Sequence, residues 1–192
     1  MKVKNTITIS NGSTLKWKEN LNNYVELKIK KNEIIRGYYR SNKIDIDSIG
    51  IHLAVFTEPF LSLLLNGKKT IESRFNINKV SPYKKVAIGD IVFIKKSGGA
   101  IFGYFIVKKV QYLTEPSVIE LKEVRKMYAE KICASAVNDF WDNRISTKFI
   151  SLFEVTKLKI ILPITINKND RMAWVVIKQS RQNSLNKELW QI

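Results

Sequence analysis

Hydrophobic and polar residues alternate in short stretches along much of this chain, a pattern that predicts β-strands. The clearest hairpin pattern is a pair of mainly apolar stretches, Ile91–Lys96 and 100–110, on either side of Ser97-Gly98-Gly99. A glycine-containing turn between two such stretches predicts a β-hairpin. Gly103, inside the second stretch, predicts a bulge or the close approach of another backbone. Further strands are expected over 52–56, 149–161 and 172–178.

Two other stretches have the spacing of helices. Thr57-Glu58-Pro59 precedes the apolar run Phe60–Leu65, and Gly67 follows it as the residue whose positive φ ends a helix. Ser117–Glu120 reads as a capping box, and the apolar residues behind it recur every three or four positions. The second pattern predicts an amphipathic helix over 118–131.

The first 48 residues predict a small β-rich extension. Val25, Leu27 and Ile29 alternate with polar residues, and the stretch 34–39 follows after the polar turn Lys30–Glu33. This arrangement is typical of a hairpin. A lone hairpin is marginally stable, so we expect it to pack on the following domain or on a partner.

Together these elements predict an α+β fold, with a small curved mixed sheet or barrel and two or three flanking helices. The polar stretch Ser41–Gly50 reads as a linker with a boundary near Ile49. We therefore divide the chain into an extension (1–48), a main domain (49–180) and a C-terminal tail (181–192).

Composition narrows the class of protein. An apolar content of 45% is that of a globular chain, and no apolar run approaches the roughly 18 residues of a membrane span. The N-terminus has no apolar segment of signal-peptide length. One cysteine, Cys133, excludes an internal disulfide and a cysteine-rich metal site. We expect a cytoplasmic protein with no membrane contact, no bound metal and no cofactor.

Net charge indicates the class of partner. Lys and Arg number 33 against 17 Asp and Glu, a formal charge of +16, and the excess is spread along the whole chain. A basic field of this size favours polyanions, with nucleic acid first among them. The alternative is a solvated basic surface without a specific partner.

The octad Gly67–Arg74, GKKTIESR, places two lysines, a glutamate and an arginine within eight residues, directly after the first predicted helix. If the octad passes from a bend into a strand, Thr70, Glu72 and Arg74 share one face and Lys69 lies at the bend.

From His52 onward the chain resembles the ASCH domain, a member of the PUA-like superfamily. The family pattern Gly-x-Lys-x-x-Glu-x-Arg stands complete as Gly67, Lys69, Glu72 and Arg74. The later features of the family follow in order. They are Gly89-Asp90 before a strand, Ser97-Gly98-Gly99 at a hairpin, Gly103 in the return strand, and Asp170-Arg171 with Trp174.

The resemblance covers about 50–178 and implies a PUA-like pseudo-barrel whose cleft, lined by the octad, handles RNA or a nucleoside. Some family members associate with RNA, others are ribonucleases, and small bacterial members are amidohydrolases acting on N4-acetylated cytidine. In that last group the resemblance assigns the working lysine to Lys69. Glu72 stands here where that group has a threonine, and Glu120 and Glu123 are the regional candidates for its distant glutamate.

The octad permits two kinds of chemistry. Lys69 and Glu72 could act together as catalytic groups, with the glutamate taking a proton while lysine and arginine hold an anion. Alternatively, the charged residues form a salt-bridge cluster that ties the turn to the sheet. Arg74 suits a phosphate or a base edge because its guanidinium is a planar fork. The full set of candidate ligand-binding residues is Lys68, Lys69, Thr70, Glu72, Arg74, Ser97, Trp141 and Arg171.

Other residues with reactive side chains are interpreted as structural. His52 is the only histidine, so a Ser–His or Cys–His catalytic pair has little support. Cys133 reads as a small packing residue and Trp174 as core, whereas Trp141 lies in a polar loop where it could stack on a base.

Three hypotheses for function follow. The first is recognition of RNA or a nucleotide in a basic cleft lined by the octad. The second is an enzyme, either a hydrolase of a modified nucleoside or a ribonuclease, that uses Lys69 and Glu72. The third is a protein-interaction module that docks a partner through residues 1–48.

Overall fold

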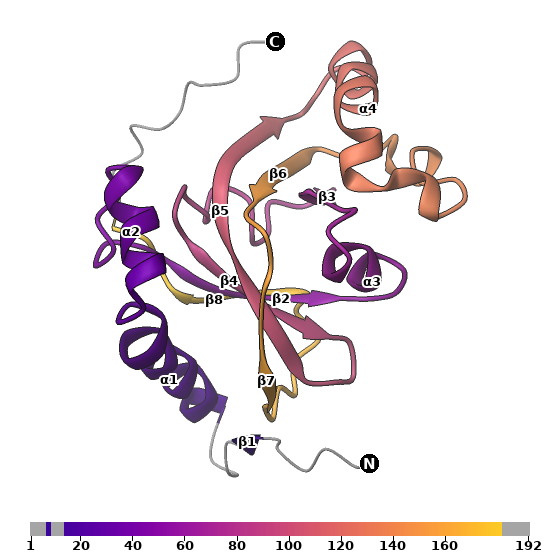
Figure 1. Cartoon of the computed structure of the whole chain (residues 1–192). Helices are drawn as coiled ribbons and strands as arrows, with labels where there is room; N and C mark the ends of the chain where they lie inside the picture. The colour runs from indigo at the N-terminus through magenta and orange to yellow at the C-terminus, as the bar shows by residue number, and fades with distance from the viewer. Residues whose placement is uncertain (1–6, 9–13, 182–192) are drawn as a thin grey trace.

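The structure of the protein is a computed structural model that describes residues 7–8 and 14–181. It has the expected α+β fold, in which helices surround a mixed sheet (Figure 1). The strands are β1 (Ile7–Thr8), β2 (Ile51–Phe56), β3 (Ile71–Asn76), β4 (Ile91–Lys96), β5 (Ile101–Thr114), β6 (Phe149–Val155), β7 (Lys159–Thr165) and β8 (Trp174–Lys178). The helices are α1 (Thr14–Tyr24), α2 (Glu33–Ser41), α3 (Phe60–Leu65) and α4 (Val118–Ile132), with a π-helical turn at Val25–Ile29 and 3-10 turns at Ala134–Ala136 and Asp142–Arg144.

The eight strands pair in the order β1-β7-β5-β4-β2-β8, while β6 joins β5 to β3. Within the described ranges, β8 pairs only with β2 and β3 only with β6, so the expected barrel is an open, curved sheet. None of the helices in residues 14–181 combines the length and the apolar character needed to cross a membrane.

The long strand β5 organises the sheet. Its first half pairs with β4 and β7, and its second half pairs with β6. Gly103 lies where β7 comes close, because a Cβ at this position would be 2.5 Å from the carbonyl oxygen of Lys159. The register shifts between Ile101 and Gly103 in the pairing with β4 and again in the pairing with β7, which confirms the predicted bulge and close approach.

The continuous apolar runs of β2 and β4 arise because this part of the sheet is buried on both faces. In β4, Ile91 and Phe93 belong to the core cluster that includes α1 and α2. Val92 and Ile94 point the other way, into the core cluster that includes α3 and Trp174.

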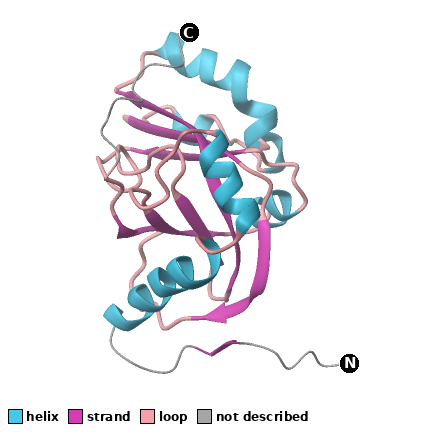
Figure 2. Cartoon of the chain, turned by 60° about the vertical axis from the view of Figure 1, so that its left-hand side comes forward, coloured by secondary structure: helices cyan, strands magenta, loops and turns pink. Residues whose placement is uncertain are grey.

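The predicted N-terminal hairpin is wrong. Residues 14–41 form α1, the π-helical turn and α2, and the only strand in the described part of the extension is the two-residue β1. Figure 2 shows the helices on the outside of the sheet strands.

Burial along this segment explains the error. Trp17, Leu21, Val25 and Ile29 lie four residues apart and are all buried, which is the stripe of a helix, whereas Leu27 is 58% exposed. The turn at 30–33 leads into a second helix because the Asn32 side chain accepts a hydrogen bond from the Ile35 N–H at 3.1 Å. The stripe packs on the sheet, so the expected packing on the following domain is confirmed.

The expected strand over 149–161 is two strands, β6 and β7, which pair with different halves of β5. The break comes at Thr156, whose N–H donates to Ile106 O and whose Oγ1 accepts from the Ile106 N–H, each at 2.9 Å. Pro163, expected to end the strand, lies within β7. Of the predicted tail, residues 182–192 lie outside the described part of the chain. The division into 1–48, 49–180 and 181–192 stays a prediction.

Candidate functional site

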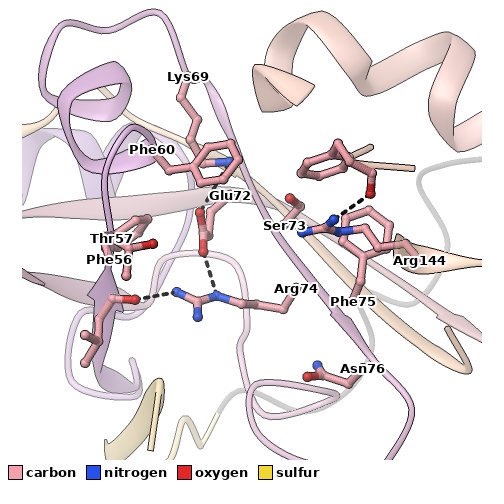
Figure 3. Close-up of a pocket in the computed structure, with 12 residues that line it drawn as sticks. Phe56, Thr57, Phe60, Lys69, Glu72, Ser73, Arg74, Phe75, Asn76 and Arg144 are labelled. Atoms are coloured by element: carbon pink, nitrogen blue, oxygen red, sulfur yellow. Dashed lines mark hydrogen bonds and ion pairs between the residues drawn. The ribbon is translucent and has the colours of Figure 1, made fainter. Parts of the chain in front are cut away.

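A cavity of about 290 Å³ lies beside β3, between the β2–α3 connection and the turn that contains Arg144. Figure 3 shows its charged side chains directed toward one another. The cavity is lined by Val55, Phe56, Thr57, Phe60, Lys69, Glu72, Ser73, Arg74, Phe75, Asn76, Phe140 and Arg144. Four of these are phenylalanines, so the charged side chains of the cavity lie next to aromatic rings.

Helix α3 and the bend after it position the octad as the sequence predicts. Gly67 has a φ of +71°, which ends α3 and turns the chain toward β3. From Ile71 onward the chain is extended, and Glu72 and Arg74 share a face. Arg74 Nε donates to Glu72 Oε1 at 2.7 Å, and its Nη2 donates to Val55 O at 3.1 Å.

Lys69 lies at the bend and is only 3% exposed. Its Nζ donates to Ile71 O at 2.8 Å and to Ile132 O at 3.3 Å, and lies 3.5 Å from Glu72 Oε2. Burial lowers the pKa of Lys69, and the Glu72 carboxylate opposes this change. Three acceptors surround three N–H groups, so the ammonium form is satisfied and holds Glu72 in place. Ile132 ends α4, so Lys69 also ties the octad to that helix.

Among the strands that the structure describes, none pairs with the edge of β3 that faces away from β6. The even-numbered residue Thr70 directs its backbone toward β6, because its carbonyl oxygen accepts a hydrogen bond from the Val155 N–H at 3.1 Å. The carbonyl oxygen of Ile71 instead accepts a hydrogen bond from Lys69 Nζ. The odd-numbered residues of β3 therefore direct their backbone groups to the edge away from β6. The next odd-numbered residues, Ser73 and Phe75, both line the cavity. The N–H and C=O groups of Ser73 therefore form a donor and acceptor pair along the cavity wall.

Arg144 and Asn76 line the cavity but were not among the predicted site residues. Arg144 lies in the Asp142–Arg144 turn, where its Nη1 donates to Phe140 O at 2.5 Å. Burial lowers the pKa of Arg144. Asn76 Nδ2 is buried and has no hydrogen-bond partner. An aromatic and polar stretch at 140–144 was visible in the sequence, but nothing local to it shows that it meets β3.

The remaining candidate ligand-binding residues do not line this cavity. Lys68, Thr70, Ser97 and Arg171 are exposed and lie outside it. Trp141 packs edge-on against Phe140 and Phe75 and lines a separate cavity of about 460 Å³. Their roles in binding stay predictions.

Glu120 and Glu123, the candidates for the distant glutamate of the amidohydrolase group, do not line this cavity either. Glu120 instead completes the predicted capping box of α4, in which its Oε2 accepts from the Ser117 N–H at 2.7 Å. Glu123 is half-buried on the same helix.

His52 has the structural position expected of it. It is fully buried, with Nε2 3.0 Å from Asp90 Oδ2 and Nδ1 3.4 Å from Trp174 Nε1. An indole N–H can only donate, so His52 Nδ1 accepts and the proton resides on Nε2. Cys133 ends α4 in the left-handed conformation, with a φ of +61°. Across residues 7–8 and 14–181, no three His, Cys, Asp or Glu side chains are grouped to hold a metal ion.

Comparison with known proteins identifies the family. The model of the ASCH domain matches residues 55–169. A search of curated proteins finds no match.

Solved structures resemble the chain in fold. A serine-to-alanine mutant of an ASCH protein from Zymomonas mobilis has a TM-score of 0.52 and 14% identity over 67% of this chain and 89% of its own. The ASCH structure from the same bacterium has a TM-score of 0.48 and 13% identity, covering 60% of this chain and 73% of that one. A protein from Enterococcus faecalis V583 has a TM-score of 0.41 and 10% identity, covering 74% and 99%. Because the family model spans more than half of the sequence, including the octad, the protein belongs to the ASCH domain family.

Proposed function

We propose that this ASCH domain binds RNA or a nucleotide and holds one nucleotide in the cavity beside β3. The observation that carries the proposal is the array of buried Lys69 and Glu72 with half-buried Arg74, at a cavity lined by aromatic rings. A volume of about 290 Å³ is near the lower end of ligand pockets, which hold roughly 300–1,000 Å³, so the cavity suits one nucleotide rather than a longer segment.

The groups around the cavity match the groups of a nucleobase. Phenylalanine rings offer stacking surfaces, which accept any base. The Glu72 carboxylate can accept a hydrogen bond from an exocyclic amine such as the N4 amine of cytosine. The backbone N–H and C=O of Ser73 can pair with an adjacent acceptor and donor on the base edge.

The basic surface supplies the long-range attraction. A formal charge of +16 favours association with a polyanion through counterion release. We assign contacts with the rest of an RNA strand to the predicted residues outside the cavity, namely Lys68, Thr70, Ser97, Trp141 and Arg171.

Fluorescence anisotropy with labelled single-stranded RNA tests the proposal. Affinity should fall steeply between about 50 and 200 mM salt, as expected for phosphate contacts. Arg74→Ala should weaken binding about ten-fold, because it removes the guanidinium from the cavity and leaves the Glu72 carboxylate without the hydrogen bond that holds it in position. Lys31→Ala is the matched control, since Lys31 is exposed and lies outside the cavity.

Two results would contradict the proposal. One is the absence of salt-dependent RNA binding by the wild-type protein. The other is an equal effect of Arg74→Ala and Lys31→Ala, provided that circular dichroism shows both variants to be folded.

One observation favours hydrolysis of a modified nucleoside as a second candidate function. Lys69 has a pKa lowered by burial and lies beside a carboxylate that could take a proton. Incubation with N4-acetylcytidine, and separately with RNA, should then give product with the wild-type protein and none with Glu72→Gln. Equal product from the two proteins would exclude catalysis by this site.

A further inference from the structure

We infer that Arg144 binds a phosphate group of the ligand, so that the cavity takes a nucleotide or an RNA residue in preference to a free nucleoside. The inference rests on the proposed function and specifies the chemical class of the ligand. Arg144 lies outside the octad, so the inference adds a specificity-determining residue to the site.

The guanidinium of Arg144 is already held in place. Its Nη1 donates to Phe140 O at 2.5 Å, and its central carbon lies 3.6 Å from the centre of the Phe140 ring. The ring of Phe75 lies 5.4 Å away. Contact with two aromatic rings fixes the plane of the fork, so little side-chain freedom remains to be lost on binding.

Among residues 7–8 and 14–181, none neutralises the charge of Arg144 through an ion pair. A guanidinium has five N–H donors, and the carbonyl oxygen of Phe140 uses one nitrogen. In the described part of the chain, no carboxylate forms an ion pair with Arg144, whereas Arg74 pairs with Glu72. Free donors and an uncompensated charge at a cavity wall suit an anion, and phosphate matches the fork geometry.

A second donor lines the same cavity. Asn76 Nδ2 is buried without a partner, and a buried donor of this kind favours a ligand that supplies an acceptor. Figure 3 shows Arg144 and Phe75 on the far side of the cavity from Phe56 and Thr57, with Glu72 between them. One ligand can therefore place its base against Glu72 and its phosphate against Arg144.

Calorimetric titration with three kinds of probe tests the assignment: the four nucleosides, their 5′-monophosphates and a six-nucleotide RNA. The best monophosphate or the RNA should bind about ten-fold more tightly than the matching nucleoside. Arg144→Gln should remove this preference while leaving nucleoside affinity within about two-fold. Arg144→Lys, which keeps the charge without the fork, should restore part of the preference.

Arg125→Gln is the matched control, because Arg125 is exposed and lines the neighbouring cavity. Its effect on the preference for phosphate should be less than about two-fold. A preference shown by the monophosphates identifies a terminal phosphate as sufficient, and one shown by the RNA alone identifies a phosphodiester.

Equal affinity for the nucleosides, the monophosphates and the RNA would overturn the inference and leave the proposed function standing. An Arg144→Gln protein that loses affinity for nucleosides and nucleotides alike would show a structural role and would also overturn it. Failure of the wild-type protein to bind any of the three probes would overturn both.

Discussion

Arg74 donates through Nε to Oε1 of Glu72 at 2.7 Å, from two positions further along the same face of β3. The pairing follows from the period-two geometry of a strand, so the relative placement of the two side chains is set by the backbone. An array carried by a strand keeps its groups in fixed positions, which is what recognition of a base edge requires. The open edge of the same strand adds the backbone groups of Ser73.

Replacing Lys69 tests how much the array of Lys69, Glu72 and Arg74 contributes to the stability of the protein. Lys69→Met should destabilise the protein by about 3–5 kcal/mol. The substitution leaves the buried Glu72 carboxylate with Arg74 as its one remaining cationic partner, and it removes the hydrogen-bond donor of the Ile71 and Ile132 carbonyl groups. Urea unfolding followed by circular dichroism measures the change.

Lys68→Met provides the comparison for that experiment. Lys68 is the exposed neighbour of Lys69, and its replacement should change the free energy of unfolding by no more than about 0.5 kcal/mol. If the two variants are equally stable, Lys69 does not support the array.

Arg74→Lys tests whether the fork, and not only the charge, is needed. Arg74 contacts Glu72 and Val55 O while its guanidinium lies 5.5 Å and 5.4 Å from the rings of Phe56 and Trp174. Lysine cannot make both hydrogen bonds in that plane, so we expect a loss of about 1 kcal/mol of stability and several-fold weaker RNA binding. Arg36→Lys, at an exposed arginine, should leave stability and RNA affinity unchanged. If Arg74→Lys also changed neither quantity, the charge alone would suffice at this position.

The octad could be predicted from sequence because its geometry is local. A helix stop at Gly67 and a strand of alternating residues place Lys69, Glu72 and Arg74 without knowledge of the rest of the fold. The role of Lys69 as a tie to Ile132 could not be predicted in this way, since the two residues meet only in the folded protein. Arg144 was missed for the same physical reason.

The N-terminal segment shows how one pattern can fit two structures. Val25, Leu27 and Ile29 satisfy the period of a strand, but Val25 and Ile29 also satisfy the period of a helix with Leu21. Tertiary packing decides, because the sheet buries the helical stripe and leaves Leu27 exposed. A longer window that included Trp17 would have favoured the helix.

Tyr39 joins this segment to the sheet and predicts a pH effect. Its hydroxyl donates to Gly89 O at 2.7 Å, and burial raises the pKa of Tyr39. Below about pH 10 both the folded and unfolded states keep the phenol proton. Above it the unfolded state loses the proton first, so the contribution of Tyr39 to stability falls as pH rises.

Comparison with Tyr39→Phe isolates this contribution. The variant should be about 1 kcal/mol less stable near pH 7, because the carbonyl of Gly89 loses its donor. The difference should hold to about pH 9 and shrink above about pH 10. A difference that stays constant into the alkaline range would contradict the assigned cause.

Two glycine-to-alanine substitutions test the packing of β5 on β7, which shapes the sheet around the site. In Gly103→Ala the new Cβ would lie 2.5 Å from the backbone oxygen of Lys159, which cannot move without breaking the strand pairing. We expect a loss of about 1–3 kcal/mol, the usual cost of overpacking.

In Gly37→Ala the new Cβ meets nothing within 4 Å and lies within α2, so stability should rise by about 0.5–1 kcal/mol. Urea unfolding of both variants under the same conditions separates the two effects, because the substitution is identical and only the surroundings differ. If Gly103→Ala were as stable as Gly37→Ala, the close approach of β7 to β5 would not exist in solution.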